Sequence, residues 1–374
     1  MTRPDDDAVP VAGQNDGQPP RWWIYRGAGQ PLQDTRLADL LPPPPPWRSF
    51  GGGPVLPPPP DDDAEIRRRL GLHRAPARQF ANFAEHEANM VNAALLLRRP
   101  LLVSGRPGTG KSSLAYRISR ELRLGRVLRW HITSRTTLQQ GLYEYDAIGR
   151  VQDTAAQRAA EGEGHSGGDR SAPPGVGDYI QLGPVGTALL PYAEPRVLLI
   201  DELDKSDLDL ANDLLSVFEE GSYSIPELLR ARRRHPRVKV LTDDPDREAE
   251  IIGGTVTCSA FPLVILTSNS EREFPPAFLR RCLLLDMPEP DENDLADMLV
   301  AHFGGEAVTE WADDLISRFL ERSRQRGGLS NDQLLNSLYL AMSARASDET
   351  GPLPEFSRTV WHGLNGTDPG ARTA

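Results

Sequence analysis

The stretch Leu-Leu-Val-Ser-Gly-Arg-Pro-Gly-Thr-Gly-Lys-Ser-Ser-Leu, residues 101–114, decides the fold. It contains the pattern G-x-x-x-x-G-K-[ST], with Gly105, Gly110, Lys111 and Ser112 at its fixed positions. The stretch begins with an apolar run typical of a buried strand, and the residues that follow it have the apolar spacing of a helix. A strand, a glycine-rich loop and a helix in this order predict a loop that binds phosphate.

Each residue type in this loop has a physical role in holding an anion. Glycines let the backbone wrap closely around phosphate oxygens, so that successive N–H groups point inward. Lys111 adds a positive charge near the β- and γ-phosphates, and Ser112 supplies a hydroxyl ligand for Mg²⁺. The helix that begins here directs the positive end of its dipole at the same anion. The predicted nucleotide-binding residues are Gly105, Pro107, Gly108, Thr109, Gly110, Lys111, Ser112 and Ser113.

Composition limits the possible partners and the compartment. The 374 residues include 42 basic and 53 acidic ones, and the formal net charge of −11 argues against general affinity for nucleic acids or anionic membranes. Cys258 and Cys282 offer neither metal-ligand spacing nor a disulfide framework, and both are expected to be core residues. The sequence has no signal peptide and no run of about 18 apolar residues, so we expect a cytoplasmic protein without membrane contact.

A second group of candidate residues follows the apolar run Val197–Ile200. A short, continuous apolar run is typical of a strand buried on both faces of a parallel sheet, and Asp201 and Glu202 stand at its carboxyl end. Ligands bind at this edge of an open α/β sheet. In ATPases with a phosphate loop, the first carboxylate holds Mg²⁺ and the second accepts a proton from the attacking water. We therefore predict Ser112 and Asp201 as metal ligands and Glu202 as the catalytic base.

Two further catalytic candidates lie later in the chain. Residues 262–269, Pro-Leu-Val-Ile-Leu-Thr-Ser-Asn, form another apolar run that ends in polar residues, which predicts Asn269 at the same sheet edge, near the γ-phosphate. Arg280 and Arg281 stand where a helix is expected to end, before a strand at residues 283–285. One interpretation is that at least one of them spreads the transition-state charge on a phosphate. The other is that both pair with surface acids.

Residues 1–75 are predicted to form a disordered or polyproline II arm. They contain the proline blocks Pro42–Pro46 and Pro57–Pro60, and such a segment buries too little apolar surface to offset its ordering entropy. The cluster at residues 21–26, Arg-Trp-Trp-Ile-Tyr-Arg, is an exception, because Trp and Tyr favour buried anchor positions. We expect this cluster to dock either on the core of this chain or on a partner.

The nucleotide-binding domain is predicted to have the α/β fold class and to cover residues 76–288. Within it, residues 152–178 are rich in Gly, Ala and Ser, which favours a flexible insertion. The run from Arg230 to Lys239 is strongly basic. We interpret it as a solvated face or a contact with an acidic neighbour, in preference to a DNA-binding surface, because the whole chain is acidic.

The sequence beyond residue 288 is predicted to be helical. Apolar residues recur at helical spacing in residues 295–303, 311–324 and 332–344. Paired glycines separate these stretches, which favours a small helical lid domain over residues 289–346. The tail, residues 347–374, is polar with scattered Gly and Pro and is expected to be loose.

Taken together, residues 80–345 resemble an AAA+ ATPase, and within that group the MoxR-like, dynein-related branch. The phosphate loop is similar to the family's Walker A motif, and Val197–Glu202 is similar to its Walker B strand. Asn269 stands at the sensor 1 position, and residues 277–282 resemble the arginine-finger region. Asn331 and Asp332 stand where the family often has a sensor 2 arginine, so no sensor 2 residue is assigned.

The resemblance implies an activity, cofactors and partners. It implies an enzyme that hydrolyses ATP with Mg²⁺ in a ring of copies, commonly a hexamer, in which one subunit donates its arginine to the next. It also implies that the enzyme remodels or activates a protein client, and MoxR-like ATPases are typically linked to client proteins that contain a von Willebrand factor A domain.

Three other functions remain open from the sequence. A DNA-directed motor or loader is suggested only by the basic run. A small-molecule phosphotransferase is compatible with the phosphate loop, although the arginine pair, Asn269 and the helical lid count against it. A switch that binds nucleotide but hardly hydrolyses it is disfavoured by the intact Asp201 and Glu202.

Overall fold

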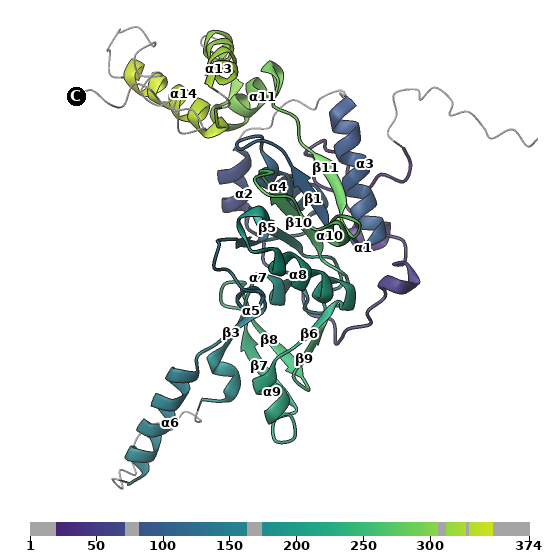
Figure 1. Cartoon of the computed structure of the whole chain (residues 1–374), viewed down its shortest axis with the longest axis vertical. Coiled ribbons are helices and arrows are strands. Elements are labelled where there is room, and N and C mark those ends of the chain that lie inside the picture. Colours follow the sequence, from purple (N-terminus) through teal and green to yellow (C-terminus); the bar gives the residue numbers. More distant parts are fainter. Residues whose placement is uncertain (1–19, 72–81, 163–173, 306–311, 327–328, 347–374) are drawn as a thin grey trace, which may run out of the picture.

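The structure is a computed structural model that describes residues 20–71, 82–162, 174–305, 312–326 and 329–346. A five-stranded parallel sheet forms its centre (Figure 1). In spatial order, its strands are β11 (Leu283–Asp286), β1 (Leu101–Ser104), β10 (Leu263–Ser268), β5 (Val197–Asp201) and β2 (Leu128–His131). The strands predicted from the apolar runs are therefore present, and the α/β fold class is confirmed.

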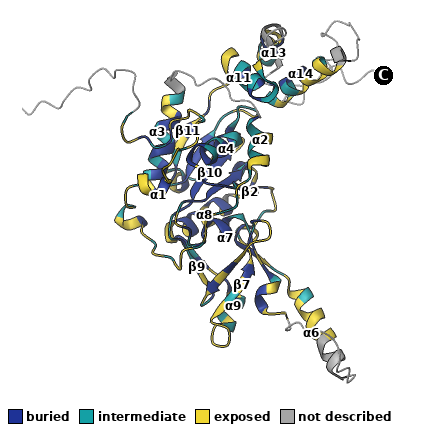
Figure 2. Ribbon diagram, turned by 180° about the vertical axis from the view of Figure 1, so that it is seen from behind, coloured by how far each residue is buried: buried dark blue, intermediate teal, exposed yellow. Residues whose placement is uncertain are grey.

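Alternating side chains of the sheet build two separate hydrophobic layers. Leu101 and Val103 face one layer, and Leu102 between them faces the other. The first layer contains residues of α3 (Asn82–Leu97) and α4 (Lys111–Leu122). The second contains residues of α5 (Leu138–Leu142), α7 (Pro184–Ala188) and α8 (Leu208–Glu220). Because both faces are covered, β1, β5 and β10 are apolar almost to their ends, and Figure 2 shows the sheet as the most buried part.

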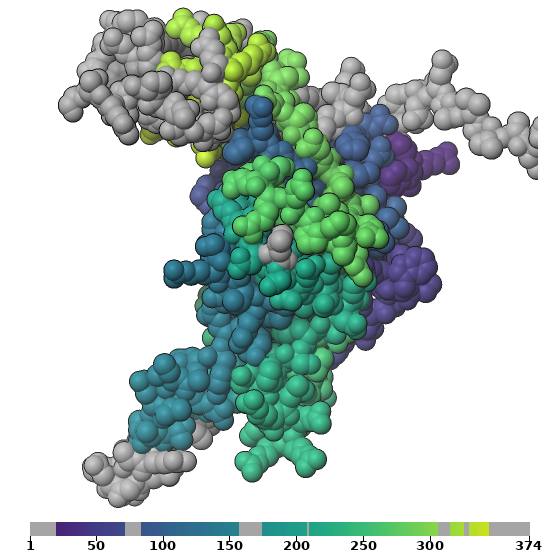
Figure 3. Space-filling view, viewed as in Figure 1, coloured from purple at the N-terminus to yellow at the C-terminus, as the bar shows by residue number. Residues whose placement is uncertain are grey.

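A second, smaller β structure extends from the end of the body that lies opposite the lid (Figures 1 and 3). One sheet has the order β3 (Tyr143–Tyr145), β4 (Ile180–Leu182), β7 (Arg237–Leu241) and β8 (Glu248–Ile252). A two-stranded sheet pairs β6 (Ser222–Ser224) with β9 (Thr255–Thr257). Between β6 and β7 lies α9 (Pro226–Ala231), and η2 (Val176–Tyr179) precedes β4.

The predicted flexible insertion is partly wrong. Helix α6 (Ala147–Gly162) covers the first part of residues 152–178, and η2 and β4 begin within its last part or directly after it. Alanine has the highest helix propensity, and the Ala pairs at 155–156 and 159–160 favour a helix, although small residues suggested a loop. Residues 163–173 of the predicted insertion lie outside the described residues.

The predicted helices of the lid are present as α11 (Glu292–Phe303), α13 (Ala312–Arg326) and α14 (Asn331–Ala346). They share a hydrophobic cluster of their own, which includes Leu299, Phe319 and Leu338. At the start of α11, the Asp291 carboxylate accepts a hydrogen bond from Asp294 N at 2.8 Å and caps the helix. The predicted loose tail, residues 347–374, lies outside the described residues.

The prediction of a disordered arm is wrong for residues 20–71. This segment contains α1 (Leu37–Leu40), η1 (Pro46–Arg48) and α2 (Asp63–Leu70), and we call it the N-terminal strap. Of the two alternatives for the aromatic cluster, the structure shows docking on the chain's own core, since Trp23 and Tyr25 are buried. Proline fixes φ before folding, so a proline-rich segment loses little entropy when a few anchors hold it. Residues 1–19 and 72–75 of the predicted arm lie outside the described residues.

Asn92 on α3 holds the beginning of the strap. Its Oδ1 accepts the backbone N–H groups of Ile24 and Tyr25 at 2.7 and 2.9 Å. Its Nδ2 donates to the Tyr25 carbonyl at 2.6 Å and to the Ala88 carbonyl at 2.7 Å. A fully buried side-chain amide thus satisfies backbone groups that the strap cannot pair by itself.

We expect Asn92→Ala to lower the free energy of unfolding by about 3 kcal/mol, because it leaves several buried backbone groups without partners. The strap should also become sensitive to protease between residues 20 and 71. Denaturant unfolding and limited proteolysis measure both effects. Asn89→Ala is a graded control, because it removes only the 2.9 Å bond from Trp23 Nε1 and should cost about 1 kcal/mol. Unchanged cleavage in Asn92→Ala would show that other contacts hold the strap.

Both cysteines are core residues, as predicted. Cys258 and Cys282 are free thiols, 0% and 6% exposed. Burial raises the pKa of each thiol to about 12, so neither is a reactive thiolate at neutral pH. Among the described helices, none has both the length and the apolar character to cross a bilayer.

Candidate functional site

The phosphate loop connects β1 to α4 and depends on glycine at two close approaches. Gly105 has φ 147°, and a Cβ there would lie 2.7 Å from the Met287 carbonyl oxygen. Gly108 has φ 82°, and a Cβ there would lie 2.7 Å from Cα of Ser330, just before α14. A side chain at either position would be both strained and obstructed. The loop therefore lies directly against the beginning of the last lid helix.

The other predicted residues of the loop are placed as a helix start requires. Gly110 is the N-cap of α4, and Ser113 N donates to the Gly110 carbonyl at 3.0 Å. Thr109 Oγ1 donates to the Arg106 carbonyl at 2.9 Å, which closes the turn that contains Pro107. The N-terminus of α4 thus faces the position predicted for phosphate.

Lys111 is the first residue of α4 and is buried. Its Nζ donates to the carbonyls of Gly105 and Arg106, both at 2.7 Å. Burial lowers the pKa of the ammonium group, and the nearby charges of Asp204, Asp201 and Glu202 act against that shift. The loop therefore holds a buried cation at the start of α4, where the phosphate is predicted to lie.

Asp201, at the carboxyl end of β5, meets the phosphate loop as predicted. Its Oδ1 accepts hydrogen bonds from Ser112 Oγ at 2.6 Å and from Thr267 Oγ1 at 2.8 Å. Its Oδ2 accepts from Arg129 Nη2 at 2.6 Å. Burial alone would raise the pKa of this carboxyl, but the bonds from Ser112, Arg129 and Thr267 outweigh it and lower the pKa. Asp201 is therefore an ionised carboxylate at neutral pH.

Glu202 has a backbone conformation that is uncommon for a side-chain-bearing residue. Its φ and ψ of 63° and 47° are left-handed, and its N–H donates to Thr267 Oγ1 at 2.9 Å. In this conformation its Oε2 accepts from Lys205 Nζ at 2.7 Å and lies 3.8 Å from His131 Nε2. Strain of this kind concentrates at functional sites, where surrounding contacts fix it.

Asn269 follows β10, at the same sheet edge as Asp201, as predicted. Its position is fixed by Asp204 of η3 (Leu203–Lys205), whose Oδ2 accepts the N–H groups of Asn269 at 2.8 Å and Glu271 at 3.1 Å. The Asp204 side chain is 3% exposed, and its Oδ1 is a buried oxygen without a hydrogen-bond partner. Asp204 therefore ties the loop of Asn269 to the segment that carries Glu202.

The side chains of the two predicted arginines, Arg280 and Arg281, contact α10 (Pro276–Leu279) and α8 and not the phosphate loop or Asp201. They follow α10 and are exposed. Arg280 Nε donates to the Pro276 carbonyl at 3.2 Å, and Arg281 Nε lies 3.4 Å from the Glu219 carboxylate. Arg281 thus pairs with a surface acid within one copy of the chain, whereas Arg280 contacts a backbone carbonyl. Both residues are exposed, which leaves them accessible to another copy.

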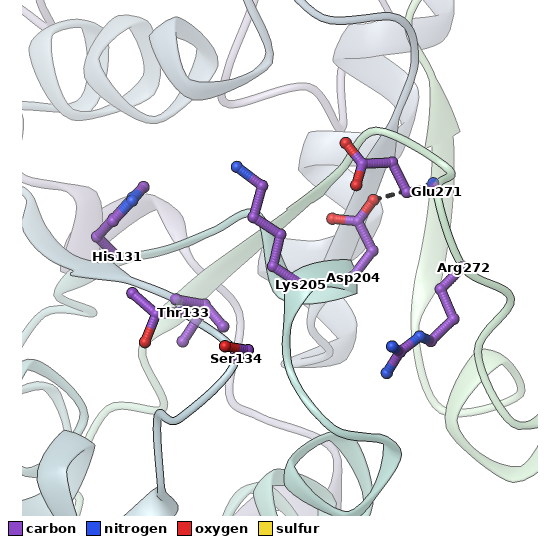
Figure 4. Close-up of a pocket in the computed structure, with 8 residues that line it drawn as sticks. His131, Thr133, Ser134, Asp204, Lys205, Glu271 and Arg272 are labelled. Atoms are coloured by element: carbon purple, nitrogen blue, oxygen red, sulfur yellow. Dashed lines mark hydrogen bonds between the residues drawn. The ribbon is translucent and has the colours of Figure 1, made fainter.

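A hollow of about 520 Å³ lies beside η3 (Figure 4). It is lined by His131, Ile132, Thr133, Ser134, Asp204, Lys205, Glu271 and Arg272. None of the predicted loop residues lines it, so it is not the phosphate site itself. It does open beside the pair formed by Glu202 and Lys205.

Sequence reasoning missed Arg129, Asp204 and Thr267. Thr267 is one of the polar residues that end the apolar run of β10, so its position was the available signal. Arg129 had none, because its contact with Asp201 depends on β2 lying beside β5. No sensor 2 residue was predicted, and the lid arginine Arg324 lines a separate hollow of about 450 Å³ with Glu289 and Leu320.

Comparison with known proteins identifies the fold family of this site. Residues 100–282 match the AAA domain of the dynein-related subfamily. The chain carries an AAA+ domain. The match covers the phosphate loop, Asp201, Glu202, Asn269 and the arginine pair. The chain is therefore an ATP-hydrolysing enzyme. AAA+ ATPases bind nucleotide, generally with Mg²⁺, and typically act as rings on protein substrates.

A solved structure of PCH-2 from C. elegans has a TM-score of 0.38 and 14% sequence identity, and the alignment covers 79% of this chain and 71% of that chain. No curated protein matches the chain. The resemblance to the MoxR-like branch therefore stays a prediction.

Proposed function

We propose that this AAA+ ATPase binds ATP with Mg²⁺ between the phosphate loop and Asp201 and uses hydrolysis to remodel or activate a partner protein. The 2.6 Å hydrogen bond from Ser112 Oγ to Asp201 Oδ1 carries the proposal, because it joins the two motifs into one site. In this proposal the enzyme is MoxR-like, cytoplasmic and active as a ring, commonly of six copies. Its client is a protein that contains a von Willebrand factor A domain.

The side chains present suit magnesium. A hydroxyl and an ionised carboxylate are hard oxygen ligands, and Mg²⁺ is usually held by one or two protein oxygens together with water and phosphate oxygens. Ser112 and Asp201 would hold the ion, and when bound it neutralises charge on the phosphates. Arg129, at 2.6 Å from Asp201 Oδ2, supplies the opposite charge that keeps this carboxylate ionised.

Glu202 and Asn269 are the proposed catalytic groups around the attacking water. Glu202 accepts the proton from water, and the hydrogen bond from Lys205 holds its carboxylate at the sheet edge beforehand. Asn269 orients the water or the γ-phosphate, and Asp204 positions Asn269 through its backbone N–H. Glu202 requires release from Lys205 to act, because the 2.7 Å hydrogen bond from the ammonium group occupies its Oε2.

Arg280 and Arg281 are proposed to act on the nucleotide of a neighbouring copy. We expect the double variant Arg280→Ala, Arg281→Ala to bind ATP normally but to hydrolyse it roughly 1,000-fold more slowly, the range of arginine fingers. Mixing it with Lys111→Ala should restore part of the activity, because each variant supplies what the other lacks. Steady-state turnover of the mixture measures this.

A control variant and two contrary results test this action between copies. The control, Arg123→Ala, changes an exposed arginine at the end of α4 and should leave turnover unchanged. A mixture no more active than the sum of its parts would remove the arginines from the neighbouring site, and so would normal turnover in the double variant.

The proposed function is tested by mass measurement in solution with and without ATP, using Glu202→Gln to hold the bound state. We expect ATP to favour a closed ring and a client protein to copurify with it. A chain that stays monomeric with ATP, or that transfers phosphate to a small molecule in place of water, would contradict the proposal.

A further inference from the structure

A cluster of unpaired positive charge lies in the turn between α9 and β7. Residues 226–240 contain six basic residues and one acidic residue, in a chain with a net charge of −11. Arg232, Arg233 and Arg234, which we call the arginine turn, are all exposed. The turn is held by its backbone, since Arg234 N donates to the Ala231 carbonyl at 2.9 Å.

The neighbouring basic residues on β7 are neutralised and the arginine turn is not. Arg237 lies 3.1 Å from Glu250, and Lys239 lies 3.6 Å from Glu248, both across the β7–β8 pair. Among the described residues, the arginine turn takes part in no ion pair. Three adjacent like charges repel one another, and an acidic ligand would relieve that repulsion. The positive charge that has no acidic partner is therefore concentrated in the arginine turn.

The position of the turn suits contact with a large partner. Figure 1 shows α9, which the arginine turn follows, at the end of the molecule opposite the lid helices. Figure 3 shows that this end projects from the body. The phosphate loop lies at the other end, against the start of α14. A partner bound to the arginine turn would leave the nucleotide site open.

Local chemistry favours a protein partner over nucleic acid. Residues 226–252 contain no Phe, Trp or Tyr on which bases could stack. Affinity for duplex DNA depends on the number of phosphates that Lys and Arg neutralise, and the ion pairs on β7 leave only a few basic groups free here. Ile252, 40% exposed, lies across from Arg237 in the strand pair and offers an apolar contact.

We propose that the arginine turn binds an acidic segment of a partner protein, with an apolar residue of that segment against Ile252. Guanidinium groups bind carboxylates through paired N–H donors, which gives direction as well as charge. This inference rests on the proposed function and states the chemistry by which the client is recognised.

Fluorescence anisotropy tests the inference on the full chain. The probe is a fluorescein-labelled peptide in which Glu-Asp pairs alternate with Leu, and the control peptide has Gln-Asn in their place. We expect the acidic peptide to bind, and Arg232→Gln, Arg233→Gln, Arg234→Gln together to weaken binding roughly ten-fold or more. Binding should also weaken as salt is added.

A matched control distinguishes an effect of the arginine turn from an effect of the chain's net charge. Arg36→Gln, Arg67→Gln, Arg123→Gln removes three other exposed arginines and should leave peptide binding unchanged. Equal weakening by both triple variants would overturn the inference. Single- or double-stranded DNA that binds the turn more tightly than the peptide would also overturn it, in favour of a nucleic-acid surface.

Basal ATP turnover distinguishes this failure from failure of the proposed function. The arginine-turn variant should hydrolyse ATP at the unaltered rate, because it lies outside the nucleotide site. Normal ATP turnover without peptide binding would overturn only this inference and would leave the proposed function unaffected. The chain could instead bind the peptide through the arginine turn but stay monomeric with ATP. That result would contradict the proposed function and support the contact with an acidic segment.

Discussion

Replacing Lys111 with Ala is expected to weaken ATP binding about 100-fold or more. The Lys111 ammonium group is buried at the start of α4, held by two carbonyl oxygens of the phosphate loop at 2.7 Å. A charge-assisted hydrogen bond contributes about 1.5–3 kcal/mol, and about 2.8 kcal/mol corresponds to a factor of 100 in affinity. Titration with a fluorescent ATP analogue measures the change in Kd.

The same change should affect the stability of the free protein little. Burying Lys111 already costs enough to lower its pKa, so removing the ammonium relieves that cost while it frees two loop carbonyls. Denaturant unfolding without nucleotide checks that the variant folds. Lys205→Ala is the matched control, since it removes a lysine that contacts Glu202 and should leave the Kd for ATP near its original value. Unaltered ATP affinity in Lys111→Ala would refute the assignment of the phosphate loop.

The central sheet could be predicted because its signals are local. Strands β1, β5 and β10 are continuous apolar runs, and at β5 and β10 the run ends in polar residues. Parallel strands place those ends at one edge, so Asp201 and Asn269 could be assigned to one site without knowledge of the strand order. The glycine-rich loop and its helix added a pattern with a fixed spacing.

The N-terminal strap could not be predicted because its partners are distant in sequence. Its average composition is polar and proline-rich, and its stability comes from a few anchors such as Trp23 and Tyr25. Its backbone donors are satisfied by Asn92 and by Glu121, which accepts from Arg26 N at 2.6 Å and Gly29 N at 2.9 Å. No local pattern shows that an asparagine in one helix and a glutamate in another face the same segment.

Strand order explains the missed contacts of the site. Arg129 reaches Asp201 only because β2 pairs with β5 in parallel, which places the two residues on neighbouring strands. The role of Asp204 depends on a loop that follows β10, more than 60 residues later in the chain. Such contacts follow from the assembled sheet and have no local sequence signal.

Replacing Glu202 with Gln is expected to lower ATP turnover about 100- to 10,000-fold while ATP binding stays nearly unchanged. Removing a general base typically costs this much in rate. Glutamine has nearly the same shape, and the Glu202 backbone bond to Thr267 does not depend on the side chain. The Lys205 contact loses its charge pairing, but neither group is a phosphate ligand in the proposed site. Single-turnover kinetics and the Kd for ATP separate the two quantities.

Two further variants distinguish the loss of a proton acceptor from the loss of a metal ligand and from the loss of a negative charge. Asp201→Asn should weaken binding of ATP with Mg²⁺ as well as turnover, because Asp201 is a proposed ligand of the ion and bonds Ser112. Glu271→Gln neutralises an exposed acid on the hollow beside Glu202 and should change neither quantity. A Glu202→Gln enzyme that turns over ATP as fast as the Glu271→Gln enzyme would show that another group accepts the proton. In that case, the left-handed backbone at Glu202 would serve only to orient its contacts with Lys205 and Thr267.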